Sequence, residues 1–390
     1  MNELEESFNK LLSYIEKENY TGHDPYDALK SPIFRLPVLR SNKFLRFAFQ
    51  QVIKRSPLNL RPLFFIPKGY NPVTVGLCIQ AYARLCKVYP ENKSEYIKKI
   101  DFLIDELEKL IPKGFSGACW GYDFDWAARY SNIPAYQPTV VATGIITNAL
   151  FIAHQTSKNP KALNLCISAA DFVLKDLNRT FDSDKDYCFS YSPFDKQTVY
   201  NASMKGVRLL AQVYSITQNE QLKKEAEKAA SYIVKKQSND GSWIYSGSRT
   251  GGWIDNYHTG YVLDCLADYI LYTQDKKFEP NLKKGYEFYV QHFFDDMKIP
   301  KFYHNKTFPV DCTAASQALL TLSRFKNTAL ATDVALWMHR NMQHPQGYFY
   351  FRKFRYYTVK TSFMRWSNAW MFAGLAELLY ESMQPEIAKK

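Results

Sequence analysis

The sequence contains no uninterrupted apolar run of the roughly 18 residues that a membrane-spanning helix needs. Its first residues, MNELEESFNKLLSYIEKEN, are charged and amphipathic, and they lack the apolar core of a secretory signal peptide. Both absences favour a cytoplasmic protein without a transmembrane segment. Peripheral contact with a membrane surface stays open.

Paired cysteines of the C-x-x-C kind are also absent, although the chain has seven cysteines. Cys78, Cys86, Cys166 and Cys265 lie within apolar helical runs, where reduced and buried thiols are expected. No ligand spacing typical of a zinc site occurs in the chain. We therefore expect neither a metal nor another cofactor.

Acidic residues are too few to balance the basic ones, because 38 Asp and Glu stand against 50 Lys and Arg, for a net charge of +12. This sign suggests an anionic partner such as a phosphate, a uronic acid, nucleic acid or an acidic membrane surface. The basic residues are dispersed along charged helices, so no nucleic-acid partner is expected. The densest cluster, at 352–355 with Lys360 and Arg365, is interleaved with aromatic residues.

One stretch, residues 220–273, shows how the rest of the chain is organised. Residues 220–236 carry apolar side chains at helical spacing and Lys and Glu on the other face, which predicts a helix with one side in water. Asn239-Asp240-Gly241 ends that helix, and a Gly-rich connection with Trp243 follows. Asp255 can cap the next helix, which is apolar on most sides and is expected to be buried.

This helix pair recurs along the chain. Inner, apolar helices are predicted to open near residues 72, 138, 201, 255, 311 and 365. Outer, charged helices are predicted at about 94–110, 160–177, 220–236, 281–294 and 325–342, with the helix at 43–54 as the first outer partner. We therefore expect a single domain, 1–390, whose helical core spans about 43–384 behind an N-terminal helical extension, 1–42.

The connections that lead into the inner helices are long and rich in Gly, Ser and aromatic residues. They include 114–126, 187–193, 241–253, 302–308 and 347–357, whereas the connections at the other end, such as TQNEQ and TQDKK, are short. All the long connections join the end of an outer helix to the start of an inner one, so they belong to one rim. Binding residues concentrate in elaborated loops on a rigid scaffold, which places the expected site at this rim.

Six outer and inner helical hairpins resemble the (α/α)6 toroid of the six-hairpin glycosidase-like superfamily and its neighbours, an all-α barrel with short strand-like insertions on one rim. Gln237 to Trp243, QSNDGSW, is similar to the QW repeat of terpenoid cyclases. The aspartate-rich motifs of those cyclases, the Asp-x-Cys zinc ligands of prenyltransferases and the β-sandwich of lyases are absent. The resemblance therefore implies a carbohydrate-active enzyme, with catalytic residues at the inner-helix N-termini and in the loops above them.

Four carboxylates on this rim are candidates for acid/base catalysis, since sugar hydrolysis needs one carboxylic acid and a second carboxylate. Asp123 and Asp125 lie between aromatic residues in WGYDFDW, and Asp255 and Asp311 open inner helices. The alternative for the last two is a purely structural helix cap. His258, one turn into its helix, is either a general acid/base or a hydrogen-bonded core residue.

The candidate ligand-binding residues are mostly aromatic, because aromatic faces stack on sugar rings. Arg365 with Lys360 could hold a carboxylate or phosphate, or Arg365 could instead pair with Asp311 or Asp255 between hairpins. The full set of binding candidates is Trp120, Tyr122, Trp126, Tyr191, Asn201, Trp253, Tyr257, Lys360, Arg365 and Trp366.

Three functions follow as hypotheses. The first is a glycoside hydrolase or lyase-like enzyme of bacterial polysaccharide metabolism that acts on an anionic glycan or glycan precursor. The second is a non-catalytic toroid that binds a glycan or lipid carrier during polysaccharide assembly. The third is a terpenoid- or prenyl-binding enzyme, which predicts a pore lined by Phe and Tyr with few carboxylates.

Overall fold

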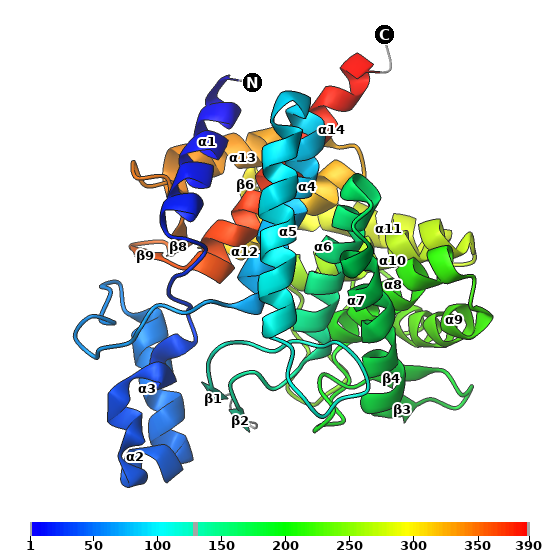
Figure 1. Ribbon diagram of the computed structural model, residues 1–390, viewed down its shortest axis with the longest axis horizontal. Helices are drawn as coiled ribbons and strands as arrows, with labels where there is room; N and C mark the ends of the chain where they lie inside the picture. The colour runs from blue at the N-terminus through cyan, green and yellow to red at the C-terminus, as the bar shows by residue number, and fades with distance from the viewer. Residues whose placement is uncertain (1, 128–131, 388–390) are drawn as a thin grey trace.

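Six inner helices form a closed ring in the computed structural model, which describes residues 2–127 and 132–387 (Figure 1). Each inner helix packs against the next one along the chain, and the sixth packs against the first. This confirms the predicted all-α toroid. The inner helices are α4 (Pro72–Val88), α6 (Val140–Ser157), α8 (Tyr200–Thr217), α10 (Asn256–Thr273), α12 (Cys312–Arg324) and α14 (Trp370–Ile387).

The outer helices cover the ring and alternate with the inner ones. Their composition explains their position: α9 buries one face, through Leu222, Ala226 and Ile233, whereas every residue of α6 from Val140 to Ala153 is buried. The outer helices are α1 (Asn2–Lys17), α5 (Lys93–Lys109), α7 (Pro160–Asp171), α9 (Glu220–Val234), α11 (Glu279–His292) and α13 (Thr328–Met342).

The sixth outer position is filled by α1 and not by the helix that the sequence suggested, 43–54. Leu4, Phe8, Leu11 and Ile15 form a buried stripe on α1 that faces α13 and α14, and the rings of Phe8 and Phe372 stack 5.5 Å apart. The predicted helix exists as α3 (Lys43–Arg55), but it buries only Gln50 and Ile53. An outer helix must bury a complete apolar stripe, which α1 has and α3 lacks.

The two rims differ as the loop lengths predicted. At the plain rim, α6, α8 and α10 each end in a left-handed residue, with φ of 58° at Lys158, 54° at Gln218 and 58° at Gln274. Such a residue lets the chain reverse within a few positions. The next outer helix therefore begins almost at once.

The elaborated rim carries the strands, all of them short and antiparallel in the described residues. The last of the sheets ties the start of α12 to the connection before α14, through the pair Asp311 and Arg352. The pairings are β1 (Trp126–Ala127) with β2 (Asn132–Ile133), β3 (Arg179–Phe181) with β4 (Tyr187–Phe189), β5 (Phe294–Asp295) with β6 (Ile299–Pro300), and β7 (Val310–Asp311) with β8 (Tyr350–Lys353) and β9 (Thr358–Ser362).

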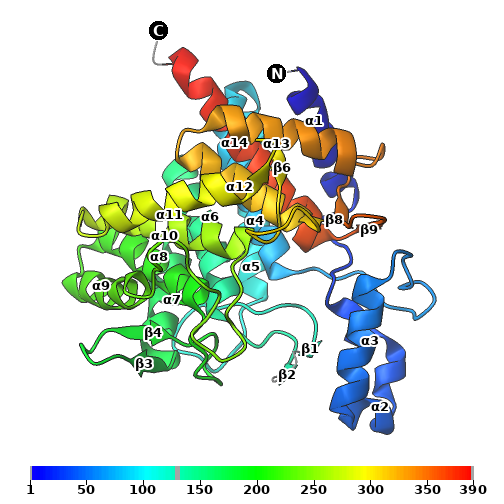
Figure 2. The same ribbon diagram turned by 180° about the vertical axis from the view of Figure 1, so that it is seen from behind.

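Short helical segments complete the chain. A wide turn of π-helix, η5 (Met364–Ala369), precedes α14, and a second one, η4 (Phe172–Asp176), continues α7. The others are η1 (Asp27–Lys30), η2 (Pro32–Arg35), η3 (Pro90–Asn92) and α2 (Pro37–Ser41). Residues 32–55, which include η2, α2 and α3, form an arm that extends away from the ring (Figures 1 and 2). Among the described helices, none is both long and apolar enough to cross a bilayer.

Candidate functional site

A cavity of about 260 Å³ opens at the elaborated rim, above the N-terminal ends of the inner helices. Most of its wall is aromatic, with six tyrosines among the lining residues, and the other polar side chains are a histidine, an asparagine, a threonine and an arginine. No carboxylate of the described residues is part of this wall. The lining residues are Tyr26, Tyr122, Phe124, Trp126, Val141, Ile145, Tyr191, Asn201, Tyr245, Trp253, Tyr257, His258, Tyr261, Thr313, Arg365, Trp366 and Trp370.

His258 contributes an imidazole to this wall, and Asp255 fixes its orientation. The Nδ1–H of His258 donates to Oδ2 of Asp255 over 2.7 Å, and the indole N–H of Trp253 donates to the same oxygen over 2.8 Å. Asp255 also caps α10, because its Oδ1 accepts from the backbone N–H of His258 over 3.0 Å. With Nδ1 bonded to Asp255, Nε2 is the ring nitrogen left for a ligand.

Aromatic rings enclose His258 on two sides. The imidazole centroid lies 4.1 Å from the ring of Tyr257 and 4.6 Å from that of Tyr245, and Tyr245 stacks on Trp253 at 4.3 Å. Burial raises the pKa of the Tyr257 and Tyr245 hydroxyls well above their ordinary value, so both stay neutral donors. The imidazole is therefore held at a fixed angle among uncharged rings.

Asp311 is fully buried and lies outside the cavity wall. Its Oδ2 accepts from Arg352 over 2.8 Å and 2.6 Å, and its Oδ1 caps α12 by accepting from the backbone N–H groups of Thr313 and Ala314. The cap that the sequence left as an alternative is therefore present at both Asp255 and Asp311. Arg352, from the densest basic cluster, is neutralised by this pair.

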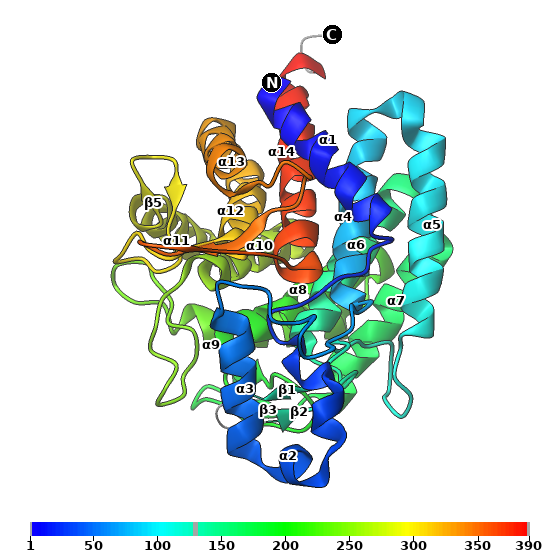
Figure 3. The same cartoon turned by 90° about the vertical axis from the view of Figure 1, so that its left-hand side faces the viewer.

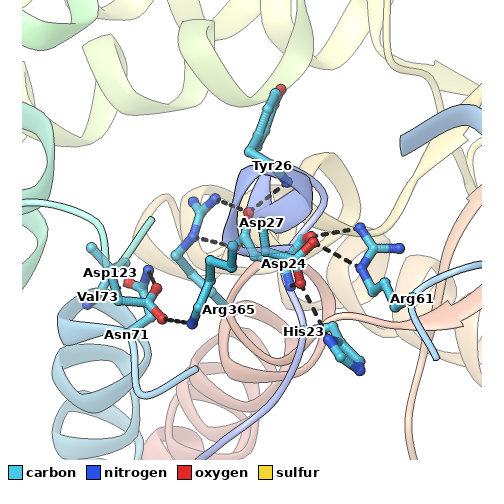
Figure 4. Close-up of polar contacts among 10 residues, drawn as sticks. His23, Asp24, Tyr26, Asp27, Arg61, Asn71, Val73, Asp123 and Arg365 are labelled. Atoms are coloured by element: carbon cyan, nitrogen blue, oxygen red, sulfur yellow. Dashed lines mark hydrogen bonds and ion pairs between the residues drawn. The ribbon is translucent and has the colours of Figure 1, made fainter. Parts of the chain in front are cut away.

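Asp123 and Asp125 lie behind the aromatic wall, although the residues that alternate with them, Tyr122, Phe124 and Trp126, line the cavity. Asp123 accepts from Lys30 over 2.9 Å and from Asn71 over 2.7 Å (Figure 4). Asp125 pairs with Arg46 of the arm over 3.0 Å. The aromatic residues and the aspartates of this loop therefore face opposite ways.

Arg365 lines the cavity, and the carboxylate of Asp24 balances its charge. Its Nε and Nη2 donate to the two oxygens of Asp24 over 2.7 Å and 3.0 Å, in the bidentate geometry (Figure 4). The partner is therefore neither of the aspartates that the sequence suggested, Asp311 and Asp255. The guanidinium lies 4.7 Å from the Tyr122 ring and 5.1 Å from the Trp366 ring.

The segment 23–27, HDPYD, was not among the candidates, yet it completes the site. Tyr26 lines the cavity between Trp126 and Trp366, with ring centroids 5.6 Å from each. Asp27 anchors the segment, because its Oδ1 accepts from the buried Arg61 over 2.8 Å (Figure 4). Two aspartates around a Pro-Tyr turn are the signal that could have drawn attention to it.

The predicted ligand contacts divide into two groups. Tyr122, Trp126, Tyr191, Asn201, Trp253, Tyr257, Arg365 and Trp366 line the cavity. Trp120 is fully buried, and its indole N–H donates to the Leu107 carbonyl over 2.9 Å. Lys360 is exposed on β9 and borders a separate hollow. Tyr245 and Tyr261 were missed, although Tyr261 lies one helical turn beyond Tyr257.

Three solved structures illustrate what this architecture resembles. The chain overlays on a cellobiose 2-epimerase from Bacillus thermoamylovorans with a TM-score of 0.59 and 12% identity, over 80% of this chain and 88% of that one. An alpha-mannanase of family GH76 from Bacteroides thetaiotaomicron gives 0.59 and 13%, over 82% and 87%. An unsaturated glucuronyl hydrolase specific for heparin gives 0.57 and 14%, over 82% and 87%.

The chain therefore shares the (α/α)6 toroid fold of these three structures. This confirms the fold that the helical hairpins suggested. No family model matches the sequence, and no curated protein matches it either. At these identities the likeness is one of fold, and the same fold carries different chemistries on its rim.

Proposed function

We propose that the chain is a carbohydrate-active enzyme that binds a sugar in the aromatic cavity and transfers a proton through His258. The observation that carries the proposal is the pair of His258 and Asp255, with the imidazole on the cavity wall and the carboxylate behind it. The solved structures with this fold include enzymes named for action on cellobiose, mannan and heparin. Aromatic walls of this kind bind the apolar faces of sugar rings.

The geometry favours a single imidazole as the acid/base group over two carboxylates. Hydrolysis by two carboxylates requires both to flank the scissile bond. Asp123, Asp125 and Asp311 are each paired with a cation behind the wall, so we assign them a positioning role. Nε2 of His258 would then accept a proton from the sugar and later return it, while Asp255 stabilises the imidazolium that forms in between.

An anionic sugar such as a uronic acid remains the predicted ligand class. Arg365 supports it, because this guanidinium lines the cavity and its position is fixed by two bonds to Asp24. The contribution of Arg365 is to orient a carboxylate more than to add net charge, since Asp24 already balances it. A cytoplasmic location stays a prediction.

The variant His258→Gln tests the proposal directly. With uronic-acid oligosaccharides as substrates, kcat is expected to fall about 10²- to 10⁴-fold, as for loss of a general acid/base. His304→Gln is the matched control, because this imidazole lies in the neighbouring loop and outside the cavity wall. Full activity of His258→Gln would contradict the assignment.

A second function is favoured by one observation, the lack of a carboxylate among the described lining residues. An aromatic wall without carboxylates is what the prenyl-binding hypothesis predicted. Thermal shift separates the two, since a ligand that binds the folded state raises the Tm. We expect a shift with acidic oligosaccharides, and a shift with prenyl phosphates alone would favour the second function.

A further inference from the structure

Exposed hydrophobic side chains are concentrated on the arm and the loop that follows it. Of the nineteen large hydrophobic side chains that are exposed in the described part of the chain, eight lie between residues 36 and 65. Leu36, Val38 and Phe44 are 59%, 73% and 75% exposed. Val38 lies in α2, at the free end of the arm, and Leu36 and Phe44 lie just before and after this helix; we call residues 35–45 the arm tip (Figure 3). An exposed apolar group of this kind marks an interaction surface.

The positive charge of the chain is concentrated in the same region. Residues 28–71, which contain the arm and the segments on either side of it, contain nine of the 50 Lys and Arg and none of the 38 Asp and Glu. This segment therefore carries +9 of the net charge of +12. On the arm tip, Arg35, Arg40 and Lys43 are exposed, and none of them has a carboxylate partner among the described residues.

The base of the arm is attached to the wall of the cavity. Gln50 exchanges two hydrogen bonds with the backbone of Ala127, at 3.1 Å and 3.3 Å, and Arg46 pairs with Asp125. Lys54 lies 3.9 Å above the ring of Tyr26, which lines the cavity. The arm therefore projects from the elaborated rim, on the side where the cavity opens.

We propose that the arm tip docks on the surface of an anionic lipid bilayer. Leu36, Val38 and Phe44 would enter the boundary between headgroups and acyl chains, while the neighbouring cations contact lipid phosphates. A second copy of the chain is disfavoured, because two tips without any acidic residue repel each other. A nucleic acid would match the charge but would leave the apolar side chains in water.

Vesicle cosedimentation of the full chain tests the proposal. We expect binding to vesicles of phosphatidylcholine mixed with phosphatidylglycerol, no binding to pure phosphatidylcholine, and weakening by added salt. Arg40→Gln and Lys43→Gln should each lower the partition coefficient about fivefold. Phe44→Ser should lower it by at least as much, and without altering the Tm, because this side chain is already in water.

The matched control is the double variant Leu271→Ser with Lys276→Gln. It removes an exposed apolar residue and an exposed cation from the plain rim, at the opposite end of the ring, and it should bind like the unaltered chain. Equal losses in the control and in Phe44→Ser would overturn the proposal. So would a dimer in solution that Phe44→Ser converts to a monomer, or the lack of any binding to anionic vesicles.

Discussion

Two regions on the axis of the ring differ in how they use charge. We call the aromatic cavity at the elaborated rim the upper region. We call a cleft of about 40 Å³, which lies among polar side chains between the inner helices, the lower region. Ile145 and Trp370 border both, so the two are neighbours. The lower cleft is lined by charged groups from five of the inner helices, among them Arg84, Lys205, Arg208, Asp264, Arg324 and Glu377.

The charges of the lower cleft mostly pair with one another across helices. Arg324 on α12 donates to Asp268 on α10 over 2.7 Å and 3.1 Å, and Arg84 on α4 donates to Glu377 on α14 over 2.7 Å. In the upper cavity the pattern is reversed, because the partners Asp24 and Asp255 lie behind the wall and leave Arg365 and His258 facing the space. We therefore infer that the lower region contributes stability and that the upper one binds the ligand.

The largest expected effect that tests this division is the loss of stability in Asp268→Asn. Asp268 is 2% exposed, and its loss leaves Arg324 without its bidentate partner. Breaking a buried pair in this way costs about 3–5 kcal/mol in the free energy of unfolding. Chemical denaturation measures this loss, and the folded fraction should keep its turnover number.

The prediction for Asp268→Asn has a control variant and an outcome that would contradict it. The exposed Lys161, which pairs with Asp105 over 2.7 Å, provides the control, and Lys161→Met should change stability very little. If Asp268→Asn instead abolished turnover at unchanged stability, the lower cleft would belong to the reaction, and the division would fail.

A smaller effect is expected from Lys205, which faces Arg208 on its own helix and Asp264, Cys265 and Asp268 on α10. Burial, and then the Arg208 guanidinium, lower the pKa of Lys205 from 10.5 to about 7. Between these values the unfolded chain binds one more proton than the folded chain, so stability rises with pH across this window. Near pH 7 the folded protein therefore bears most of the penalty of burying the amine.

Lys205→Met removes that titration. The variant should be more stable than the unaltered chain near pH 7, and its advantage should shrink as the pH approaches 10.5. Denaturant unfolding across this range measures the effect, with the exposed Lys196→Met as control. An advantage that does not change with pH would show that packing, and not charge, sets the cost of Lys205.

The helical hairpins could be predicted from the sequence because the spacing of apolar residues in each helix indicates which of its faces are buried. The partners of the charged residues could not, since those contacts join segments that are distant in the sequence. Arg365 contacts Asp24 only when the ring closes, and Arg61 contacts Asp27 from the other side of the arm segment. For the same reason the sequence did not predict that α1 is an outer helix, since its apolar stripe packs against α13 and α14 at the other end of the chain. The lack of acidic residues in 28–71 was visible in the sequence, but its significance depends on the arm, which exposes the basic residues of the arm tip.

The smallest effect is expected on kcat, from loss of the hydrogen bond that Trp253 of the cavity wall donates to Asp255, the partner of His258. Trp253→Phe keeps an aromatic ring on Tyr245 but removes the indole N–H that donates to Asp255 over 2.8 Å. One hydrogen bond to a charged carboxylate is worth about 1.5 kcal/mol or more, so kcat should fall at least about tenfold while the Tm changes little. Tyr303→Phe, on the same rim but outside the cavity wall, is the control. If Trp253→Phe lowered stability as much as Asp268→Asn, the upper region would be as structural as the lower one, and the two would no longer differ in kind.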